Sequence, residues 1–294
     1  MSTPGSSTPE LGSVSFQHVT AADGVTLGVR RIEGQGKPIV ALHGFTGDGS
    51  TMIPVLDACR DGRPVMSIDL VGHGASDSPE DLGHYAMSSV VDQVLSIIGP
   101  HDPGHVHLLG YSMGGRVALS IAARAPWYFG SITTISSTPG VLDPVDRTKR
   151  YDADQELAAH AESIGLDAFI DEWLALPLFA SYVDGLSSAE REATIAQRRS
   201  GSVTGLANSL RGTGTGSMPP VWQTLPSLRS PMLAIAGEHD EKYVGIANMV
   251  REAAPAAQVA IVADAGHVAH QENCSAVAAR ITEFLEVCER HADF

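Results

Sequence analysis

Short apolar runs alternate with helical patterns along most of this chain, and this alternation restricts the fold more than any other sequence feature. Each apolar run ends in a glycine-containing or polar loop, which is typical of strands buried on both faces. The predicted strands lie within residues 37–44, 63–77, 105–112, 130–137, 230–240 and 258–267. The predicted helices cover residues 88–99, 113–126, 244–254 and 275–289. This order predicts an α/β fold with a mostly parallel central sheet and helices on both faces.

The alternation stops between residues 138 and 230, where no clear buried strand occurs. This segment is helix-like and contains turn signals such as "PLFAS" and "RGTGTGS", so we expect an inserted helical cap at 138–230. Residues 13–137 and 231–294 then form the core, and residues 1–12 form a flexible tail. Because ligands of open α/β sheets bind at the carboxyl ends of the strands, a cap there would cover the site. We interpret "GTGTG" as a loop or hinge, because no strand precedes it and no Lys-Ser/Thr follows.

Composition restricts the kind of partner. With 294 residues, 43% of them hydrophobic, the chain is long enough for one large domain or one domain with an insertion. The formal charge of −15 disfavours nucleic acid and anionic membranes. No apolar run reaches the roughly 18 residues of a membrane span, and the start "MSTPGSSTPELGS" lacks the regions of a signal peptide. We therefore expect a cytoplasmic protein, a monomer or a small homo-oligomer, that acts on a small molecule.

Cysteine and histidine spacing favours neither a disulfide framework nor a metal site. Cys59, Cys274 and Cys288 are an odd, scattered set without a CxxC motif. The histidine pairs at 105/107 and 267/270 are spaced like metal ligands, but no third ligand accompanies either pair. We expect no metal and no cofactor.

The stretch "LLGYSMGGRVALS", residues 108–120, carries the strongest functional signal. Gly110 to Gly114 fit the pattern G-x-S-x-G, and they lie after a predicted strand and before a predicted helix, as a nucleophile elbow requires. Glycines beside the serine permit a sharp turn that strains its backbone and exposes its Oγ. Ser112 is therefore the candidate catalytic residue.

A serine hydroxyl becomes reactive when a histidine, itself oriented by a carboxylate, takes its proton. After a nucleophile elbow the acid and then the histidine follow in the chain. Asp240 closes "MLAIAGEHD" and His267 closes "VAIVADAGH", both after strands that follow the elbow. Glu238 and His270 are the nearby alternatives. We favour Asp240 because it lies deeper in its loop, and His267 because Gly266 opens the turn before it.

An anionic intermediate needs preorganised N–H donors. In a nucleophile-elbow fold one donor is the amide after the serine, here Met113, and the other comes from the loop after an early strand. The loop "HGFTG", residues 43–47, has this position, so Phe45 is the candidate second donor. We interpret "DLVGHGASD" as structural, with His73 as a loop residue that takes no part in catalysis.

An arginine follows the serine by about one helical turn. Arg116 therefore lies on nearly the same side of the helix as Ser112, and helical side chains tilt back toward the N-terminus. Burying an unpaired charge is expensive, so Arg116 has either a structural acid partner or an anionic ligand. Basic clusters in the cap segment, "DRTKR" and "QRRS", favour the ligand, since arginine binds carboxylates in a bidentate manner.

Several segments resemble one family. From Val40 to Leu285 the chain resembles the α/β-hydrolase superfamily with an inserted cap. Within it, "GYSMGGR", "SSTPGVLD", "RYDAD", "WLALPLFAS", "GLANSLRGTGTG", "GEHDEKY" and "AGHVAHQEN" resemble the 2-succinyl-6-hydroxy-2,4-cyclohexadiene-1-carboxylate synthases of menaquinone biosynthesis. The resemblance implies a lyase that removes pyruvate from a cyclohexene tricarboxylate, with the serine of a Ser112–Asp240–His267 triad as general base.

The resemblance also implies contacts with a small anionic polycarboxylate. Tyr111 and Arg116 would contact it from the elbow, and Arg150, Trp173 and Arg198 from the cap segment. A slip of one residue would exchange Arg198 for Arg199, and Trp173 could instead be part of the cap's own core. The segment after "EN" departs from the family, since Cys274 stands where proline is usual.

Two other functions remain open at this point. One is a serine hydrolase of the same fold, an esterase or carbon–carbon bond hydrolase that acts on a small acidic substrate. The other is a binding protein that keeps a hydrolase-like pocket, which the complete set of triad and oxyanion residues disfavours. A hydrolase would form an acyl intermediate and turn over esters, whereas the lyase needs no acyl-enzyme.

Overall fold

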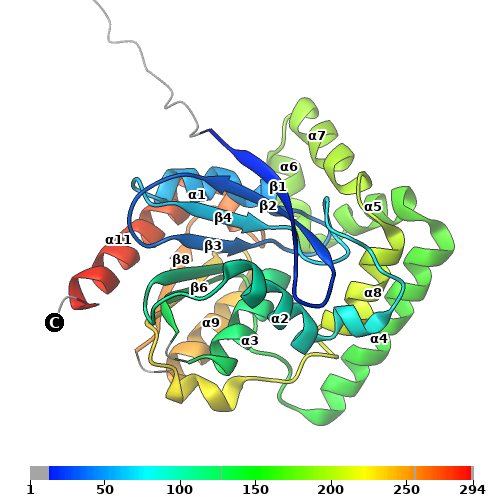
Figure 1. The fold of residues 1–294 in the computed structure, drawn as a ribbon. Coiled ribbons are helices and arrows are strands. Elements are labelled where there is room, and N and C mark those ends of the chain that lie inside the picture. The colour runs from blue at the N-terminus through cyan, green and yellow to red at the C-terminus, as the bar shows by residue number, and fades with distance from the viewer. Residues whose placement is uncertain (1–12, 127, 255, 293–294) are drawn as a thin grey trace, which may run out of the picture.

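A central eight-stranded sheet organises the computed structural model, which describes residues 13–126, 128–254 and 256–292 (Figure 1). The strands are β1 (Ser15–Thr20), β2 (Thr26–Ile32), β3 (Ile39–Leu42), β4 (Val65–Ile68), β5 (Val106–Tyr111), β6 (Phe129–Ile135), β7 (Met232–Gly237) and β8 (Gln258–Val262). Their order in the sheet is β1-β2-β4-β3-β5-β6-β7-β8. The six strands from β4 to β8 pair in parallel, and β1 and β2 pair antiparallel. The predicted α/β fold with a mostly parallel sheet is confirmed, whereas the predicted tail lies outside the described residues.

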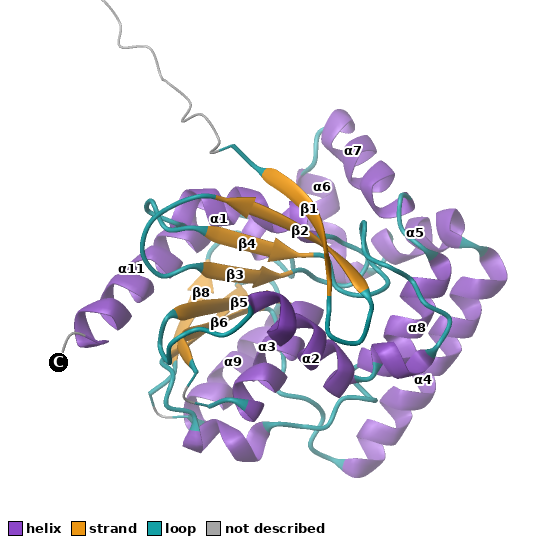
Figure 2. Cartoon of the chain, in the orientation of Figure 1, coloured by secondary structure: helices purple, strands orange, loops and turns teal. Residues whose placement is uncertain are grey.

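Helices cover both faces of this sheet, as Figure 2 shows. Helices α2, α3 and α9 pack on one face, and α1 and α11 pack on the other. Neighbouring residues of one strand serve opposite faces: Val40 and Leu42 of β3 join the first core, and Ile39 and Ala41 join the second. A strand covered on both faces must be apolar at every position, which explains the continuous apolar runs. These core helices are α1 (Ile53–Cys59), α2 (Met87–Ile98), α3 (Met113–Arg124), α9 (Glu241–Ala253), α10 (Ala269–Glu272) and α11 (Cys274–Ala292), with 3-10 turns η1 (Gly49–Met52) and η2 (Leu82–Tyr85).

The described residues between β6 and β7 are helical or irregular, and we call 138–230 the cap segment. Its helices α4, α5 and α8 share a third apolar cluster that includes Ala158, Phe169 and Leu206. Asp143 caps the start of α4, and Ser187 forms a capping box at α7. The arrowheads of β3 and β4 point toward these helices (Figure 2). The segment contains α4 (Pro144–Ile164), α5 (Leu166–Leu174), η3 (Pro177–Phe179), α6 (Ala180–Gly185), α7 (Ser188–Arg199), α8 (Val203–Thr213) and η4 (Trp222–Ser227).

Two elements near the N-terminus were not predicted from the sequence. The hairpin β1–β2 adds an antiparallel edge to the sheet, and β2 aligns Val29 with Ile68 of β4. Almost every residue of β1 is exposed, so this strand lacks the apolar run that marks a buried strand. Among the described residues, no helix combines the length and the apolar character needed to cross a membrane.

Candidate active site

The site lies where the direction of strand succession reverses. In the sheet, β3 lies between β4 and β5. The chain runs from β3 to β4 on one side and from β5 to β6 on the other, so the loops after β3 and β5 lead in opposite directions. Such a switch point at the carboxyl ends of the strands is the usual ligand site of an open α/β sheet. His43 to Gly47 follow β3, and Ser112 follows β5. Asp240 and His267 follow β7 and β8 at the same edge.

Ser112 lies in a strained turn between β5 and α3. Its φ of 48° and ψ of −106° are unusual for a residue with a side chain. The turn packs so closely that a Cβ on Gly114 would collide with the carbonyl of Leu42, and one on Gly110 with the carbonyl of Gly114. Only glycine fits at these two positions, so the G-x-S-x-G pattern here is a requirement of the turn's packing.

The structure brings Ser112, His267 and Asp240 together. The hydroxyl of Ser112 lies 3.1 Å from Nε2 of His267, and Nδ1 of His267 lies 2.7 Å from Oδ2 of Asp240. His267 and Asp240 are both buried, with side chains only 3% exposed. The alternative acid, Glu238, is exposed and accepts a hydrogen bond from the amide of Asp264.

The alternative histidine, His270, is buried behind the elbow. Its ring centroid lies 4.3 Å from that of Tyr111, and its ring Nε2 lies 3.3 Å from the side-chain amide of Gln271. Burial, together with the charges of the nearby His267 and Arg198, lowers the pKa of His270 to about 3. Neutral His270 thus packs against Tyr111 without touching Ser112.

The loop after β3 is held by the side chain of His43. The Leu70 amide donates to Nε2 of His43 over 3.0 Å, so Nε2 is an acceptor and the proton lies on Nδ1. Nδ1 then donates to the carbonyl of Gly44 over 2.8 Å. Because the two ends of a trans peptide point in opposite directions, this bond fixes the N–H of Phe45 as well. In the described part of the chain, the amides of Phe45 and Met113 donate to no protein group.

A cavity of about 370 Å³ opens beside the triad. Core and cap segment both line it, and Ser112, Met113 and His267 are among the core residues. On the cap side it is lined by residues of α4, α5, η3 and α8, together with Gly214 and Thr215 of the "GTGTG" stretch. The stretch predicted to be a loop or hinge is therefore also part of the wall.

Three basic side chains line this cavity, and we call them the cation wall: Arg116 of α3, Arg150 of α4 and Lys242 of α9. Arg116 donates from Nη2 to the carbonyl of Thr213 over 3.0 Å, and its buried Nε has no partner. No carboxylate of the described residues lies within 4.0 Å of Arg116. Burial lowers the pKa of Arg116 to about 10, so the group is still charged at neutral pH. Of the two predicted alternatives, the structure therefore favours the anionic ligand.

The other two members of the cation wall are closer to solvent. Arg150 donates from Nε to buried Asp154 over 2.8 Å, and Asp154 also accepts from the amide of Gly216. Lys242 lies over the ring of Tyr243, with 5.4 Å between Nζ and the ring centroid. Lys242 and Tyr243 were not among the predicted site residues, although the segment "GEHDEKY" that contains them was noted.

Aromatic rings form part of the apolar lining of the cavity. Trp173 packs 5.0 Å from Phe45 and 5.6 Å from Phe179, measured between ring centroids. Its buried indole Nε1 has no partner in the described structure. Tyr111 lies 5.6 Å from the ring of His267. Predicted contacts Tyr111 and Trp173 therefore line the same cavity as Ser112.

Arg198 and Arg199 point in different directions. Arg199 binds Asp171 on the surface over 2.6 Å. Arg198 is buried, its Nε has no partner, and its charge acts on Tyr111 and His270. Arg198 does not line the cavity as the described structure has it. Its contact with substrate stays a prediction, and Arg199 is the less suitable of the two.

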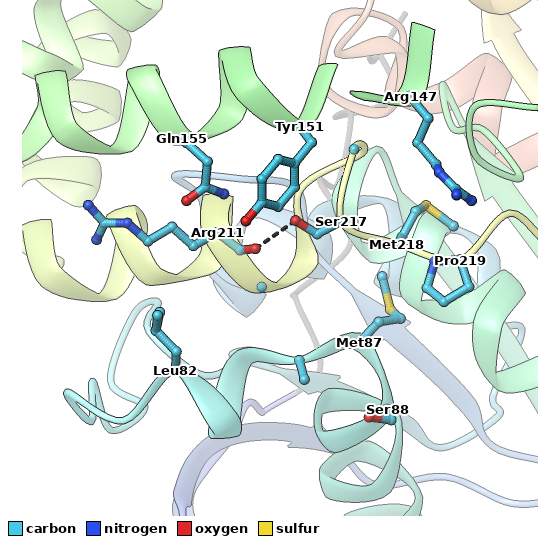
Figure 3. A pocket seen from close by; sticks show the side chains of 13 residues that line it. Leu82, Met87, Ser88, Arg147, Tyr151, Gln155, Arg211, Ser217, Met218 and Pro219 are labelled. Atoms are coloured by element: carbon cyan, nitrogen blue, oxygen red, sulfur yellow. Dashed lines mark hydrogen bonds between the residues drawn. The ribbon is translucent and has the colours of Figure 1, made fainter. Parts of the chain in front are cut away.

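A second hollow of about 650 Å³ lies along a neighbouring face of α4 (Figure 3). Arg147 and Tyr151 of α4 point into it, opposite Met87 of α2. No triad residue lines it. Helix α4 thus separates two concave surfaces, with Arg150 on the side of the triad.

One group of potential metal ligands is found among the described residues. Glu238, His239 and Asp264 have ligand atoms within 4.8 Å of one another, and all three residues are exposed. Neither predicted histidine pair belongs to it. An exposed group of acidic residues is common without a bound ion, so it does not change the chemistry of the site.

Comparison with known proteins agrees with this geometry. The family model of the alpha/beta hydrolase fold matches residues 37–273. A Bacillus subtilis (strain 168) protein with the provisional name 2-succinyl-6-hydroxy-2,4-cyclohexadiene-1-carboxylate synthase is 35% identical over 277 residues, which are 94% of this chain and 99% of that protein. The synthase of that name from Enterobacter sp. (strain 638) is 30% identical, covering 86% of this chain and 94% of that protein.

Solved structures place the chain in the same group. MenH from S. aureus superposes with a TM-score of 0.81 at 29% identity, covering 93% of this chain and 98% of that one. A thermophilic esterase from Thermogutta terrifontis superposes with a TM-score of 0.79 at 21% identity, covering 93% of this chain and 99% of that one, and shows the shared fold. The chain therefore belongs to the α/β-hydrolase fold family and, within it, to the family of 2-succinyl-6-hydroxy-2,4-cyclohexadiene-1-carboxylate synthases.

Proposed function

We propose that this protein is a lyase that eliminates pyruvate from 2-succinyl-5-enolpyruvyl-6-hydroxy-3-cyclohexene-1-carboxylate. The product is 2-succinyl-6-hydroxy-2,4-cyclohexadiene-1-carboxylate. The observation that carries the proposal is Arg116, a charged side chain that shares the cavity of Ser112 and has no carboxylate partner among the described residues. Relatives that bear the name of this synthase and cover most of the chain support it.

The triad supplies the base. Ser112 takes the proton from ring carbon C2, which is acidic because it lies next to the succinyl ketone. The serine's own proton passes to Nε2 of His267, 3.1 Å away, and Asp240 stabilises the imidazolium that forms. No bond forms between serine and substrate, so the strained elbow serves to position an oxygen for proton transfer.

The electron pair left by the proton has a defined route. It moves first toward the ketone oxygen, where the amides of Phe45 and Met113 are the proposed donors. It then forms the C2=C3 bond as the original C3=C4 bond shifts to C4=C5 and the C5–O bond to the enolpyruvyl group breaks. The departing enolpyruvate takes the proton from His267 and becomes pyruvate, which regenerates the resting triad.

The remaining lining residues would bind and orient the substrate. Arg116 and Arg150 bind carboxylates, and Tyr111 and Trp173 pack against the ring. Arg198 is buried and its charge acts on Tyr111, and it stays a predicted substrate contact. The cap segment, 138–230, covers the cavity and keeps water from the reacting atoms.

The direct test is to incubate the purified protein with the enolpyruvyl precursor and to follow pyruvate with a coupled dehydrogenase. The expected result is equal amounts of pyruvate and of the conjugated diene, which absorbs in the ultraviolet. A short neutral ester is the second substrate, because a serine hydrolase would turn it over through an acyl-enzyme. Rapid ester hydrolysis without pyruvate release would instead establish the hydrolase function.

A further inference from the structure

The cavity has a basic residue that the sequence resemblance did not assign. Lys242 follows Asp240 by two residues, at the start of α9, and its side chain lines the cavity at the solvent-exposed rim. It forms no ion pair within 4.0 Å among the described residues. Its ammonium lies over the ring of Tyr243, and that ring packs 4.8 Å from His267. This stack directs the ammonium toward the side of the triad.

The cation wall surrounds the cavity from three different elements. Arg116 comes from α3, Arg150 from α4 and Lys242 from α9. Their charges interact, since Arg150 and Arg116 each lower the pKa of Lys242, after the larger effect of burial. Repulsion between three cations around one cavity costs free energy, and a bound anion would offset this cost. Asp154 compensates part of the charge of Arg150, and Asp240 is already bound to His267.

The substrate of the proposed function carries three carboxylates, on the ring, at the end of the succinyl chain and on the enolpyruvyl group. They are attached at or through different ring carbons, so cations on different elements around the cavity can each bind one of them. We propose that Lys242 binds the third carboxylate, and that Arg116, Arg150 and Lys242 together select a tricarboxylate over a dicarboxylate. This inference rests on the proposed function for the identity of the substrate.

Two simple acids test the selection without the reaction. Propane-1,2,3-tricarboxylate and pentanedioate have the same five-carbon chain and differ by one central carboxylate. Isothermal titration should show that the wild-type protein binds the tricarboxylate about tenfold more tightly, as one charge-assisted hydrogen bond provides. The Lys242→Met variant should bind both acids within about twofold of each other, and Lys242→Arg should restore the preference.

A second lysine provides the matched control. Lys149 is exposed on α4, pairs with Asp146 and does not line the cavity, so Lys149→Met removes the same charge elsewhere. It should keep the wild-type preference, which separates contact from the general effect of net charge. In the pyruvate assay, Lys242→Met should raise KM about tenfold and leave kcat within about twofold, because the residue binds substrate away from the transferred proton.

The outcomes distinguish this inference from the proposed function. If the wild-type protein releases pyruvate but Lys242→Met keeps both the KM and the preference for the tricarboxylate, the assignment of Lys242 is wrong and the lyase stands. If the wild-type protein releases no pyruvate but prefers the tricarboxylate, and the Lys242→Met variant has lost this preference, the tricarboxylate site stands and the lyase assignment is wrong. Equal binding of the two acids by the wild-type protein overturns the inference outright.

Discussion

The proposed catalytic triad and the cation wall lie at the same cavity, but their polar groups find hydrogen-bond partners in opposite ways. Ser112, His267 and Asp240 bind one another in a closed chain of hydrogen bonds. Arg116 has only a backbone carbonyl as partner, and Lys242 has no acid partner in the described structure. Groups that hydrogen-bond one another are already positioned before substrate binds, whereas a cation without an anionic partner is neutralised only when an anion binds.

This difference suggests a division of labour between chemistry and recognition. The triad and the amides of Phe45 and Met113 come from loops of the α/β core, and they can act on any substrate that reaches them. We propose that the cation wall selects which substrate does so. Changes in the triad should therefore abolish turnover of every substrate, and changes in the cation wall should depend on the charge of the substrate.

The largest effect is expected from Ser112→Ala. Without its hydroxyl, the proton of C2 has no acceptor within reach of His267, so pyruvate release should fall by at least about 10³-fold. The coupled pyruvate assay measures the loss. Binding of propane-1,2,3-tricarboxylate should be unchanged, because the cation wall remains intact. Undiminished pyruvate release by this variant would show that serine is not the base and would remove the triad from the chemistry.

Arg116→Met should have the next largest effect, and it should depend on the substrate. Loss of a buried charge-assisted contact is expected to lower kcat/KM for pyruvate release by about 10²-fold. Hydrolysis of a neutral ester such as p-nitrophenyl acetate should change by less than about threefold, since no carboxylate is bound. Equal losses on both substrates would make Arg116 a structural residue of α3 and remove it from the cation wall.

The difference between the two regions also explains which parts of the site could be predicted from the sequence alone. The elbow, its strand and its helix are contiguous from residue 105 to 126, so local patterns were sufficient to predict them. The order Ser112, Asp240, His267 followed from the rule for nucleophile-elbow folds. These are the parts of the site where close packing leaves few alternatives, as the collision at Gly114 shows.

The cation wall could be predicted only in part, because its members come from distant elements. Whether Arg116 has an acid partner depends on where Thr213 and Asp154 lie after folding. Lys242 was not identified, since a lysine two residues after an aspartate carries no signal by itself. The hairpin β1–β2 was missed for a different reason, because its exposed outer strand lacks an apolar run.

Lowering the pH should destabilise the packing around the triad before it changes the charge of the cation wall. His73 packs 5.7 Å from Phe45, and His270 packs against Tyr111. Burial lowers the pKa of each to about 3. A histidine with a lowered folded-state pKa stabilises the fold above its unfolded pKa of about 6.5, and this contribution is lost as pH falls toward about 3. Arg116, with a pKa of about 10, keeps its charge over this range.

At pH 5 one such histidine should lower the free energy of unfolding by about 2 kcal/mol. Each pH unit below the unfolded pKa of about 6.5 costs about 1.36 kcal/mol, and pH 5 lies about 1.5 units below it. Denaturant unfolding at pH 7 and pH 5 measures it. His73→Gln should reduce the difference between the two pH values by about this amount. An unaltered difference in His73→Gln would contradict the assignment of acid sensitivity to this region.

The smallest effect concerns the two faces of α4 and tests whether the cation wall ends where the cavity does. Arg150 faces the triad, whereas Arg147 points into the second hollow (Figure 3). Both are half-buried arginines less than one turn apart, so substituting either one by methionine removes the same charge from the same helix. Effects on folding or on net charge that do not depend on contact with the substrate should therefore be equal in Arg147→Met and Arg150→Met.

Arg150→Met should raise KM for the precursor about tenfold, because a carboxylate loses its charged partner while the triad keeps its geometry. The effect should be smaller than that of Arg116→Met, since Arg150 is closer to solvent and already shares its charge with Asp154. Arg147→Met should change KM by less than about twofold. Steady-state pyruvate release decides between them. A comparable rise in both variants would mean that the substrate senses the helix's total charge, and recognition would then extend beyond the residues that line the cavity.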